Sequence, residues 1–349
     1  MSDSLVTTVG AEPPPGWQDL VLAQGGIYHD LRWIQLIGTY FRFPVAYLSV
    51  ADSVGLASVL ALAEVPSLGW GRRLVSFPFS YAAGPASRVE TATRAIMEAA
   101  ATLGRERRAR RVEVKHWTGP ATAYAGFNRV RHYAAYRVAT TDGVEALWQR
   151  LHADSTRRSI RRAERAGVTV VRGETGGEWE VMARLQDATA HSHGIPSPPH
   201  GFFIEACRSL QTQGLADLWL ARVPAIGLAA GIVVWKGRRE WVYAFGASRP
   251  DTLEFRPNHA LLWHALREAA GGGVLFDLGR AAPEQEGLVQ FKLRWGAEPV
   301  ALSYDYWPDA GGLNALHRAR GPLALAGRLW RRLPAPVARL GSRLYRYLG

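Results

Sequence analysis

The sequence predicts an α/β protein of the α+β type, with two successive units that each contain a mixed, mostly antiparallel sheet flanked by helices. Segments with helical spacing of apolar residues alternate with strand-like runs over residues 27–306. The order of these elements in the first part of the span recurs in the second part without strict repetition of sequence. Three strands in quick succession within the second part favour a mixed sheet over a fully parallel one.

The first unit is expected over residues 27–143. Apolar residues at helical spacing predict a helix within 28–41, and the Ala-rich residues 88–110 predict another. Strands are expected in four apolar runs, at 45–52, 58–65, 72–85 and 111–117. Residues 1–26 contain Pro-Pro-Pro and Gly-Gly and are expected to form a flexible N-terminus.

The second unit is expected over residues 144–306. Its helices are predicted at 143–153, 154–167, 178–193, 202–213 and 258–273. Its strands are predicted at 168–173, 215–223, 227–237, 239–248 and 274–279. Residues 307–349 form a separate basic, amphipathic tail.

Composition places the protein among soluble globular chains, with 48% hydrophobic and 21% charged residues. The single cysteine, Cys207, excludes an intramolecular disulfide and fits a reducing compartment. The N-terminus does not have the pattern of a signal peptide, and no apolar run of about 18 residues is present. A cytoplasmic location is therefore expected.

The net charge of +12 is concentrated at one end of the chain. Residues 310–349 contain eight arginines and no Asp or Glu, which leaves +4 for all other residues. A mildly basic body does not indicate DNA binding, and none is expected. In the tail, Val337, Leu340, Leu344 and Leu348 form one apolar stripe with arginines largely off it. This pattern favours peripheral binding to an anionic membrane surface, and packing on the body or on a partner is the alternative.

One stretch, FDLGRAAPEQEGLVQFKLRWGAEP (residues 276–299), combines a strand end with a rare lysine. The chain has only three lysines, and Lys292 lies here between Phe291 and Trp295. Asp277 interrupts the apolar strand, which is expected to stop at Gly279–Arg280. Residues at strand ends of α/β sheets often face a ligand. An ion pair of Lys292 with Asp277 or Glu298 is the alternative explanation.

Two further segments are candidates for anion binding. Asn258 is predicted to cap the helix at 258–273, where the helix dipole and Arg256 favour a phosphate or carboxylate. Arg158 and Arg162 lie on a helix with three more arginines, and guanidinium groups match phosphate geometry. For Asn258 and Arg256, the alternative is an ordinary capped helix without a ligand. For Arg158 and Arg162, the alternative is a solvent-exposed helix face.

The loop HSHGIPSPPHGFF contains His191, His193 and His200 but no Cys or acidic residue. A substrate-lining or solvent-exposed loop is expected here in preference to a metal site, and no metal is predicted. The sequence also lacks a nucleophile elbow, a paired-carboxylate signature and a dinucleotide fingerprint.

The order FDLGR…FK..WGAEPV.L.Y resembles the signature of the Fem-type transferases. This superfamily contains peptidoglycan interpeptide-bridge aminoacyltransferases and the FemAB-like proteins of exopolysaccharide gene clusters. RRSIRRAERAGV, HGIPSPPHGFF and LVSFPFSYAAGP are similar to further family motifs, so the resemblance covers residues 27–306. It implies two tandem GNAT-like acyltransferase domains, the second of them catalytic.

The resemblance also implies roles for these residues. Lys292 coincides with the lysine of the family's FK motif and would stabilise the oxyanion, with Asp277 orienting it or accepting a proton. Arg280 would hold a phosphate, while Arg256 and Asn258 would line the donor site. Arg158, Arg162, His193 and Trp295 are the remaining candidates for binding substrate or cofactor.

The implied reaction is transfer of an acyl or aminoacyl group to an amino group of a small-molecule or lipid-linked saccharide precursor. No permanently bound cofactor is expected. The chain has no room for the long two-helix arm of the tRNA-dependent members, which favours acyl-CoA over aminoacyl-tRNA as donor. Two other functions stay open: a non-catalytic scaffold at the membrane surface, and a nucleic-acid-binding protein.

Overall fold

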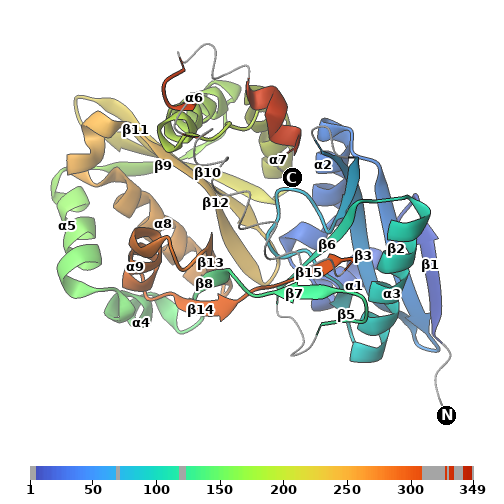
Figure 1. Ribbon diagram of the computed structural model, residues 1–349. Helices are drawn as coiled ribbons and strands as arrows, with labels where there is room; N and C mark the ends of the chain where they lie inside the picture. Colours follow the sequence, from blue (N-terminus) through green and yellow to red (C-terminus); the bar gives the residue numbers. More distant parts are fainter. Residues whose placement is uncertain are drawn as a thin grey trace. The chain divides into compact units, whose positions relative to one another are not determined.

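The computed structural model describes residues 5–67, 71–117, 123–308, 327, 330–333 and 341–347 (Figure 1). These residues form two compact units. The first comprises residues 5–132, 301–308 and 344–347, and the second comprises residues 133–300 with 327, 330–333 and 341–343. Both units are α/β, each with one mixed sheet flanked by helices. The predicted fold class is confirmed.

The first unit contains an eight-stranded sheet. Its strands are β1 (Val6–Gly10), β2 (Val45–Asp52), β3 (Gly55–Pro66), β4 (Arg72–Val75), β5 (Ala86–Ser87), β6 (Arg111–His116), β7 (Asn128–Val130) and β15 (Ser303–Trp307). The order is β1-β2-β3-β4-β6-β15-β7, with β5 beside β3. Only β4 and β6 pair in parallel; the other neighbours are antiparallel. The helices are α1 (Trp17–Gln24), η1 (Ile27–His29), α2 (Leu31–Phe41) and α3 (Glu90–Glu106).

The second unit contains a seven-stranded sheet. Its strands are β8 (Ala134–Val138), β9 (Thr169–Gly173), β10 (Ala216–Val223), β11 (Gly227–Lys236), β12 (Glu240–Ser248), β13 (Leu275–Ala281) and β14 (Glu298–Ala301). Their order is β14-β8-β13-β12-β11-β10-β9, and β12 and β13 pair in parallel. The helices are α4 (Gly143–Arg150), η2 (Ala153–Arg157), α5 (Arg158–Arg165), α6 (Gly176–His193), η3 (Phe202–Cys207), α7 (Arg208–Thr212), η4 (Pro250–Phe255), α8 (Pro257–Gly271) and α9 (Glu286–Arg294).

The expected flexible N-terminus is wrong for the described part of residues 1–26. β1 pairs with β2 over five residues, and α1 buries Trp17, Leu20 and Val21. The three prolines lie between these two short elements, and Gly25 ends α1. The residues of β1 are mostly exposed and do not alternate between buried and exposed, so the sequence gives no strand signal there. Pairing with β2 stabilises this strand instead.

The units also divide the chain differently from the expected boundaries at 143/144 and 306. β8 precedes the expected boundary but pairs with β13 of the second sheet, and β15 pairs with β6 and β7 of the first. Apolar alternation identifies a strand without identifying the sheet that it joins, because backbone hydrogen bonds with a distant partner decide membership.

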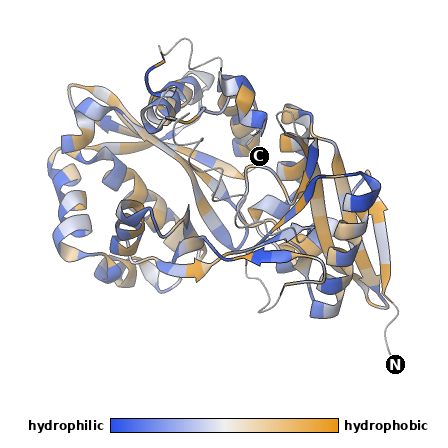
Figure 2. Cartoon of the chain, viewed as in Figure 1, coloured by the Kyte–Doolittle hydropathy of each residue, from blue (hydrophilic) through white to orange (hydrophobic). Residues whose placement is uncertain are grey.

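Hydrophobic residues are frequent along the central strands of each unit, while the helices mix hydrophilic and hydrophobic residues (Figure 2). In the second unit, α8 packs against β9–β13, and α6 packs against β11 and β12. These two helices lie on opposite faces of the sheet (Figure 1). The α8 side of the core includes Leu261, Leu262 and Leu266. The candidate site lies at the edge of β12, where its pairing with β13 ends.

Most of the predicted amphipathic tail lies outside the described residues, including Val337, Leu340 and Leu348. Gly341–Tyr347 form a 3₁₀ turn, and Tyr345 stacks on Phe79 with ring centroids 4.7 Å apart. Among the described residues, no helix combines the length and the apolar character needed to cross a membrane.

Candidate active site

The second sheet opens where β12 and β13 separate. They pair in parallel only over Glu240–Val242 and Leu275–Asp277. Beyond this point β13 shifts register against β8 between Asp277 and Arg280, and Gly279 adopts a left-handed φ of 79° that favours glycine. β12 continues to Ser248 beside β11 alone. One edge of residues 243–248 therefore has no strand partner within the described residues, so its backbone groups are open to an extended ligand.

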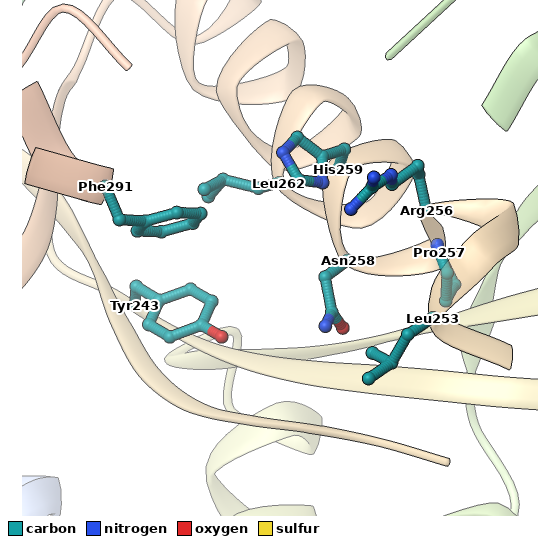
Figure 3. Close-up of a pocket in the computed structure, with 8 residues that line it drawn as sticks. All are labelled: Tyr243, Leu253, Arg256, Pro257, Asn258, His259, Leu262 and Phe291. Carbon is teal, nitrogen blue, oxygen red and sulfur yellow. The ribbon is translucent and has the colours of Figure 1, made fainter. Parts of the chain in front are cut away.

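A pocket of about 240 Å³ lies beside this edge (Figure 3). It is built by β12, by η4 and the start of α8 with Arg256 between them, and by α9. The lining residues are Tyr243, Leu253, Arg256, Pro257, Asn258, His259, Leu262 and Phe291. The pocket thus combines apolar walls with a small number of polar groups, which is typical of small-molecule sites.

The first turn of α8 forms the polar end of the pocket. Arg256 is the N-cap residue in a left-handed conformation, and Pro257 occupies the first helical position. The N–H groups of His259 and Ala260 both donate to the Arg256 carbonyl. The positive potential here consequently comes from the helix dipole and the Arg256 guanidinium more than from open N–H groups.

Asn258 does not cap α8, contrary to the sequence prediction. The chain has already turned at Arg256, and proline at the first helical position fixes the start one residue before Asn258. The Asn258 side chain donates to Ser248 Oγ at 3.1 Å, and it lines the pocket. Asn258 therefore lies at the start of α8 without capping it, and its role in binding a donor stays a prediction.

His259 is a pocket residue that sequence reasoning missed. Burial and the charge of Arg256 lower its pKa to about 4, so the imidazole is neutral at physiological pH. Its ring lies 5.6 Å from that of Trp295 and 6.3 Å from that of Phe291, measured between centroids. The only available signal was its position in the first turn of a helix after proline.

Tyr243 is the second missed residue. A β-bulge in β12 places Tyr243 opposite Val234 and Phe245 opposite the adjacent Val233. The Tyr243 hydroxyl then covers Gly246, where an added Cβ would collide with that oxygen. Burial raises the pKa of Tyr243 to about 12, so the hydroxyl stays protonated. Gly246 therefore makes room for the side chain that lines the pocket.

Lys292 is buried, with 4% of its surface exposed, and lies on α9 next to the pocket residue Phe291. Its Nζ donates to the carbonyl oxygens of Gly279 at 2.7 Å and Arg280 at 2.9 Å. Burial lowers its pKa to about 8, with Asp277 opposing this shift and Arg280 adding to it. The Lys292 ammonium is thus held by two backbone carbonyl groups, and the Asp277 charge also acts on it.

Asp277 forms a buried ion pair with Arg137, with 3.3 Å between Oδ2 and Nε. Its Oδ1 accepts a hydrogen bond from the N–H of Gly279 at 2.7 Å. The neighbouring Glu240 is buried, and desolvation followed by the Asp277 charge raises its pKa well above the ordinary value. Asp277 thus fixes the same turn that Lys292 holds from the other side of the backbone.

The other predicted residues lie at different distances from the pocket. Trp295 is buried and contacts His259, whereas the Arg280 guanidinium lies over the Tyr133 ring at 4.6 Å. Arg158 and Arg162 are exposed on α5, and His193 is exposed at the end of α6; none of these three lines the pocket. The described residues contain no cluster of three or more His, Cys, Asp or Glu arranged to hold a metal ion.

Residues 149–293 match the family described as an acetyltransferase (GNAT) domain. The chain has a tandem GNAT fold. FemX superposes with a TM-score of 0.67 at 14% identity, covering 85% of this chain and 96% of FemX. The C-terminal domain (DUF2156) of a protein described as a lysylphosphatidylglycerol synthetase from Agrobacterium fabrum superposes with a TM-score of 0.57 at 15% identity. The match covers 87% of this chain and 94% of that domain. L-PGS from Bacillus licheniformis superposes with a TM-score of 0.54 at 14% identity, covering 93% of this chain and 98% of L-PGS.

These matches confirm the resemblance to the FemAB-like GNAT superfamily at the level of fold. No curated protein matches the sequence. The GNAT acetyltransferase domain coincides with the second unit, which contains the pocket and the separated strands.

The first GNAT unit closes the equivalent gap with its own chain. β4 and β6 pair in parallel over Arg73–Val75 and Arg111–Glu113. Ser76 then continues the contact: its N–H donates to Glu113, and its Oγ accepts from the Lys115 N–H at 2.7 Å. The Lys115 ammonium donates to the Ser80 carbonyl at 3.2 Å. The open site therefore belongs to the second unit.

Proposed function

We propose that the chain is an N-acyltransferase that uses acyl-CoA to form an amide on an amine of a cell-envelope or exopolysaccharide precursor. The observation that carries this proposal is the pocket at the start of α8, directly beside the unpaired edge of β12. The reaction forms a C–N bond between the amine and the acyl carbon and breaks the C–S bond of the thioester.

In this proposal, the parts of coenzyme A lie in order along the pocket. Arg256 and the dipole of α8 attract the pyrophosphate. Leu253, Leu262 and Phe291 provide apolar contact for the pantetheine arm. The open edge of β12 offers backbone groups to the two pantetheine amides, as an exposed strand edge does for an extended peptide.

Lys292 supplies a cation for the developing oxyanion in this proposal. An ammonium has three donors, and two of them are held by the Gly279 and Arg280 carbonyls. The ammonium also lies over the Tyr136 ring, 5.3 Å from its centroid, so the charge is held in position before the reaction begins. With a pKa of about 8, most of the Lys292 population is charged at neutral pH.

The proposed acceptor is a saccharide amine, either soluble or lipid-linked, and the basic tail would hold the protein at an anionic membrane surface. The name of one structural neighbour, lysylphosphatidylglycerol synthetase, associates that protein with a lipid product. Aminoacyl-tRNA is the alternative donor, and a non-catalytic scaffold is the alternative function.

Calorimetric titration of the full chain with CoA and acetyl-CoA tests the proposed donor. We expect both to bind at one site, and binding to weaken in R256A. A wild-type chain that binds neither compound, while sedimenting with anionic lipid vesicles, would contradict the proposed function and favour the scaffold.

A further inference from the structure

A second group of polar residues lies on the opposite face of the sheet in the second unit. Asp187 on α6 accepts a hydrogen bond from Ser197 Oγ at 2.5 Å, and its other oxygen lies 2.5 Å from His200 Nε2. Ser197 and His200 belong to the loop between α6 and η3. The Asp187 side chain is 12% exposed and that of His200 is 35% exposed, so the carboxylate is shielded while the imidazole reaches solvent.

The Asp187 carboxylate fixes the tautomer of His200. An ionised carboxylate only accepts hydrogen bonds, so His200 Nε2 carries the proton that lies between them. In the neutral imidazole with this tautomer, Nδ1 carries the lone pair, and the hydrogen bond to Asp187 leaves Nδ1 unused. A histidine oriented in this way by a carboxylate is equipped to accept a proton from a reacting group.

The aromatic residues that follow His200 connect the Asp187–His200 pair (the dyad) to the part of β12 that is not paired with β13. Phe202 and Phe203 begin η3 and contact Phe245, with ring centroids 6.2 Å and 5.0 Å apart. Phe245 lies beyond Val242, the last β12 residue paired with β13. The dyad is therefore anchored to the stretch of β12 that borders the gap.

Tyr243 and Phe245 present opposite sides of this stretch. Tyr243 lines the pocket with α8, whereas Phe245 packs against η3. A donor bound at the start of α8 occupies the first side and leaves the η3 side of the gap for the second substrate. Nothing in the proposed donor site uses His200.

We propose that His200, oriented by Asp187, is the general base that takes the proton from the acceptor amine. This inference rests on the proposed function. As the amine nitrogen attacks the acyl carbon, its proton moves to His200 Nδ1. The C–N bond forms, the C–S bond breaks, and the proton passes from His200 to the departing thiolate, giving an amide and the free CoA thiol. Ser197 holds the second oxygen of Asp187 and thereby keeps the carboxylate in place.

The test measures thiol release from acetyl-CoA with glucosamine or water as nucleophile, alongside calorimetric binding of CoA. In H200A we expect thiol release to fall by about 10²-fold or more, with CoA affinity unchanged. Added imidazole should restore a measurable share of the rate in H200A, because it can enter the vacated space and accept the proton. H200Q keeps an N–H for Asp187 but has no basic nitrogen, so it should lose the same activity while preserving the fold. H152Q alters an exposed histidine elsewhere in the unit and serves as the control.

The outcomes separate the two proposals. Undiminished thiol release in H200Q, or a loss in H200A that imidazole does not relieve, would overturn the role of His200 while CoA binding still supports the donor site. A wild-type chain that binds CoA but releases no thiol with either nucleophile also overturns it, because no transfer remains for His200 to assist. Absence of CoA binding in the wild type rejects the proposed function itself.

Discussion

The Lys292 ammonium lies 2.7 Å from the carbonyl oxygen of Gly279, the residue whose left-handed conformation accompanies the separation of β13 from β12. The rare lysine is thus bonded to the backbone turn that opens the second sheet. Because these bonds hold both the turn and the ammonium, the geometry of the gap and the position of the charge are coupled.

Lys292→Ala should abolish acyl transfer, with a loss of about 10²-fold or more, because a fixed cation near the oxyanion disappears. Thiol release from acetyl-CoA provides the rate, and thermal unfolding shows whether the fold persists. Lys236→Ala is the matched control, since Lys236 pairs with Asp217 away from the pocket. Full activity in the Lys292 variant would remove this residue from the mechanism.

The lowered pKa of Lys292 predicts how stability changes with pH. The folded pKa is about 8 and the ordinary value is 10.5, so the unfolded chain binds more protons between these values and stability rises with pH. Relative to Lys292→Met, the wild type should gain about 2 kcal/mol between pH 7 and pH 9.5. Urea unfolding of both proteins at each pH measures this difference. A constant difference across the range would contradict the lowered pKa.

Arg256→Ala should weaken CoA binding by about tenfold or more, because a charged partner of the phosphates is lost at the start of α8. Calorimetry at fixed ionic strength measures the affinity. Arg184→Ala removes an exposed arginine of α6 that pairs with Glu180, and should leave the affinity unchanged. Equal losses in both variants would indicate a general effect of charge instead of a specific phosphate contact.

Gly246→Ala should destabilise the protein by about 1–3 kcal/mol, since the new methyl group meets the Tyr243 hydroxyl. In a Tyr243→Ala background the same substitution should cost far less, because the obstructing ring is gone. Chemical denaturation of the wild type, both single variants and the double variant gives the coupling energy. Additive effects would show that Tyr243 does not occupy the space over Gly246.

Sequence patterns predicted the features that depend on local order. The apolar spacing of α2, the strands β2 and β3 and the helix α8 were all evident from the chain itself. The sequence also predicts Arg256 and Asn258 at one helix start, and both residues line the pocket there. The rarity of lysine pointed to Lys292, although not to the carbonyl groups that it binds.

The remaining features depend on register and on distant partners. The strand around Asp277 does not stop at Gly279 as expected; it continues to Ala281 through a shift of register. Periodicity carries no information about such shifts, which also place Tyr243 over Gly246. His200 and Asp187 are 13 residues apart, and only the fold of the intervening loop brings them together.

The pairing of β15 has a consequence for protein synthesis. The first sheet needs β15 between β6 and β7, yet residues 303–307 are translated after all strands of the second sheet. On the ribosome, the second GNAT unit is therefore the first to have a complete set of strands. The first sheet cannot be completed until the second unit has been translated, because β6 and β7 lack β15 between them until then. The unit that is translated first is therefore the last to have all of its strands.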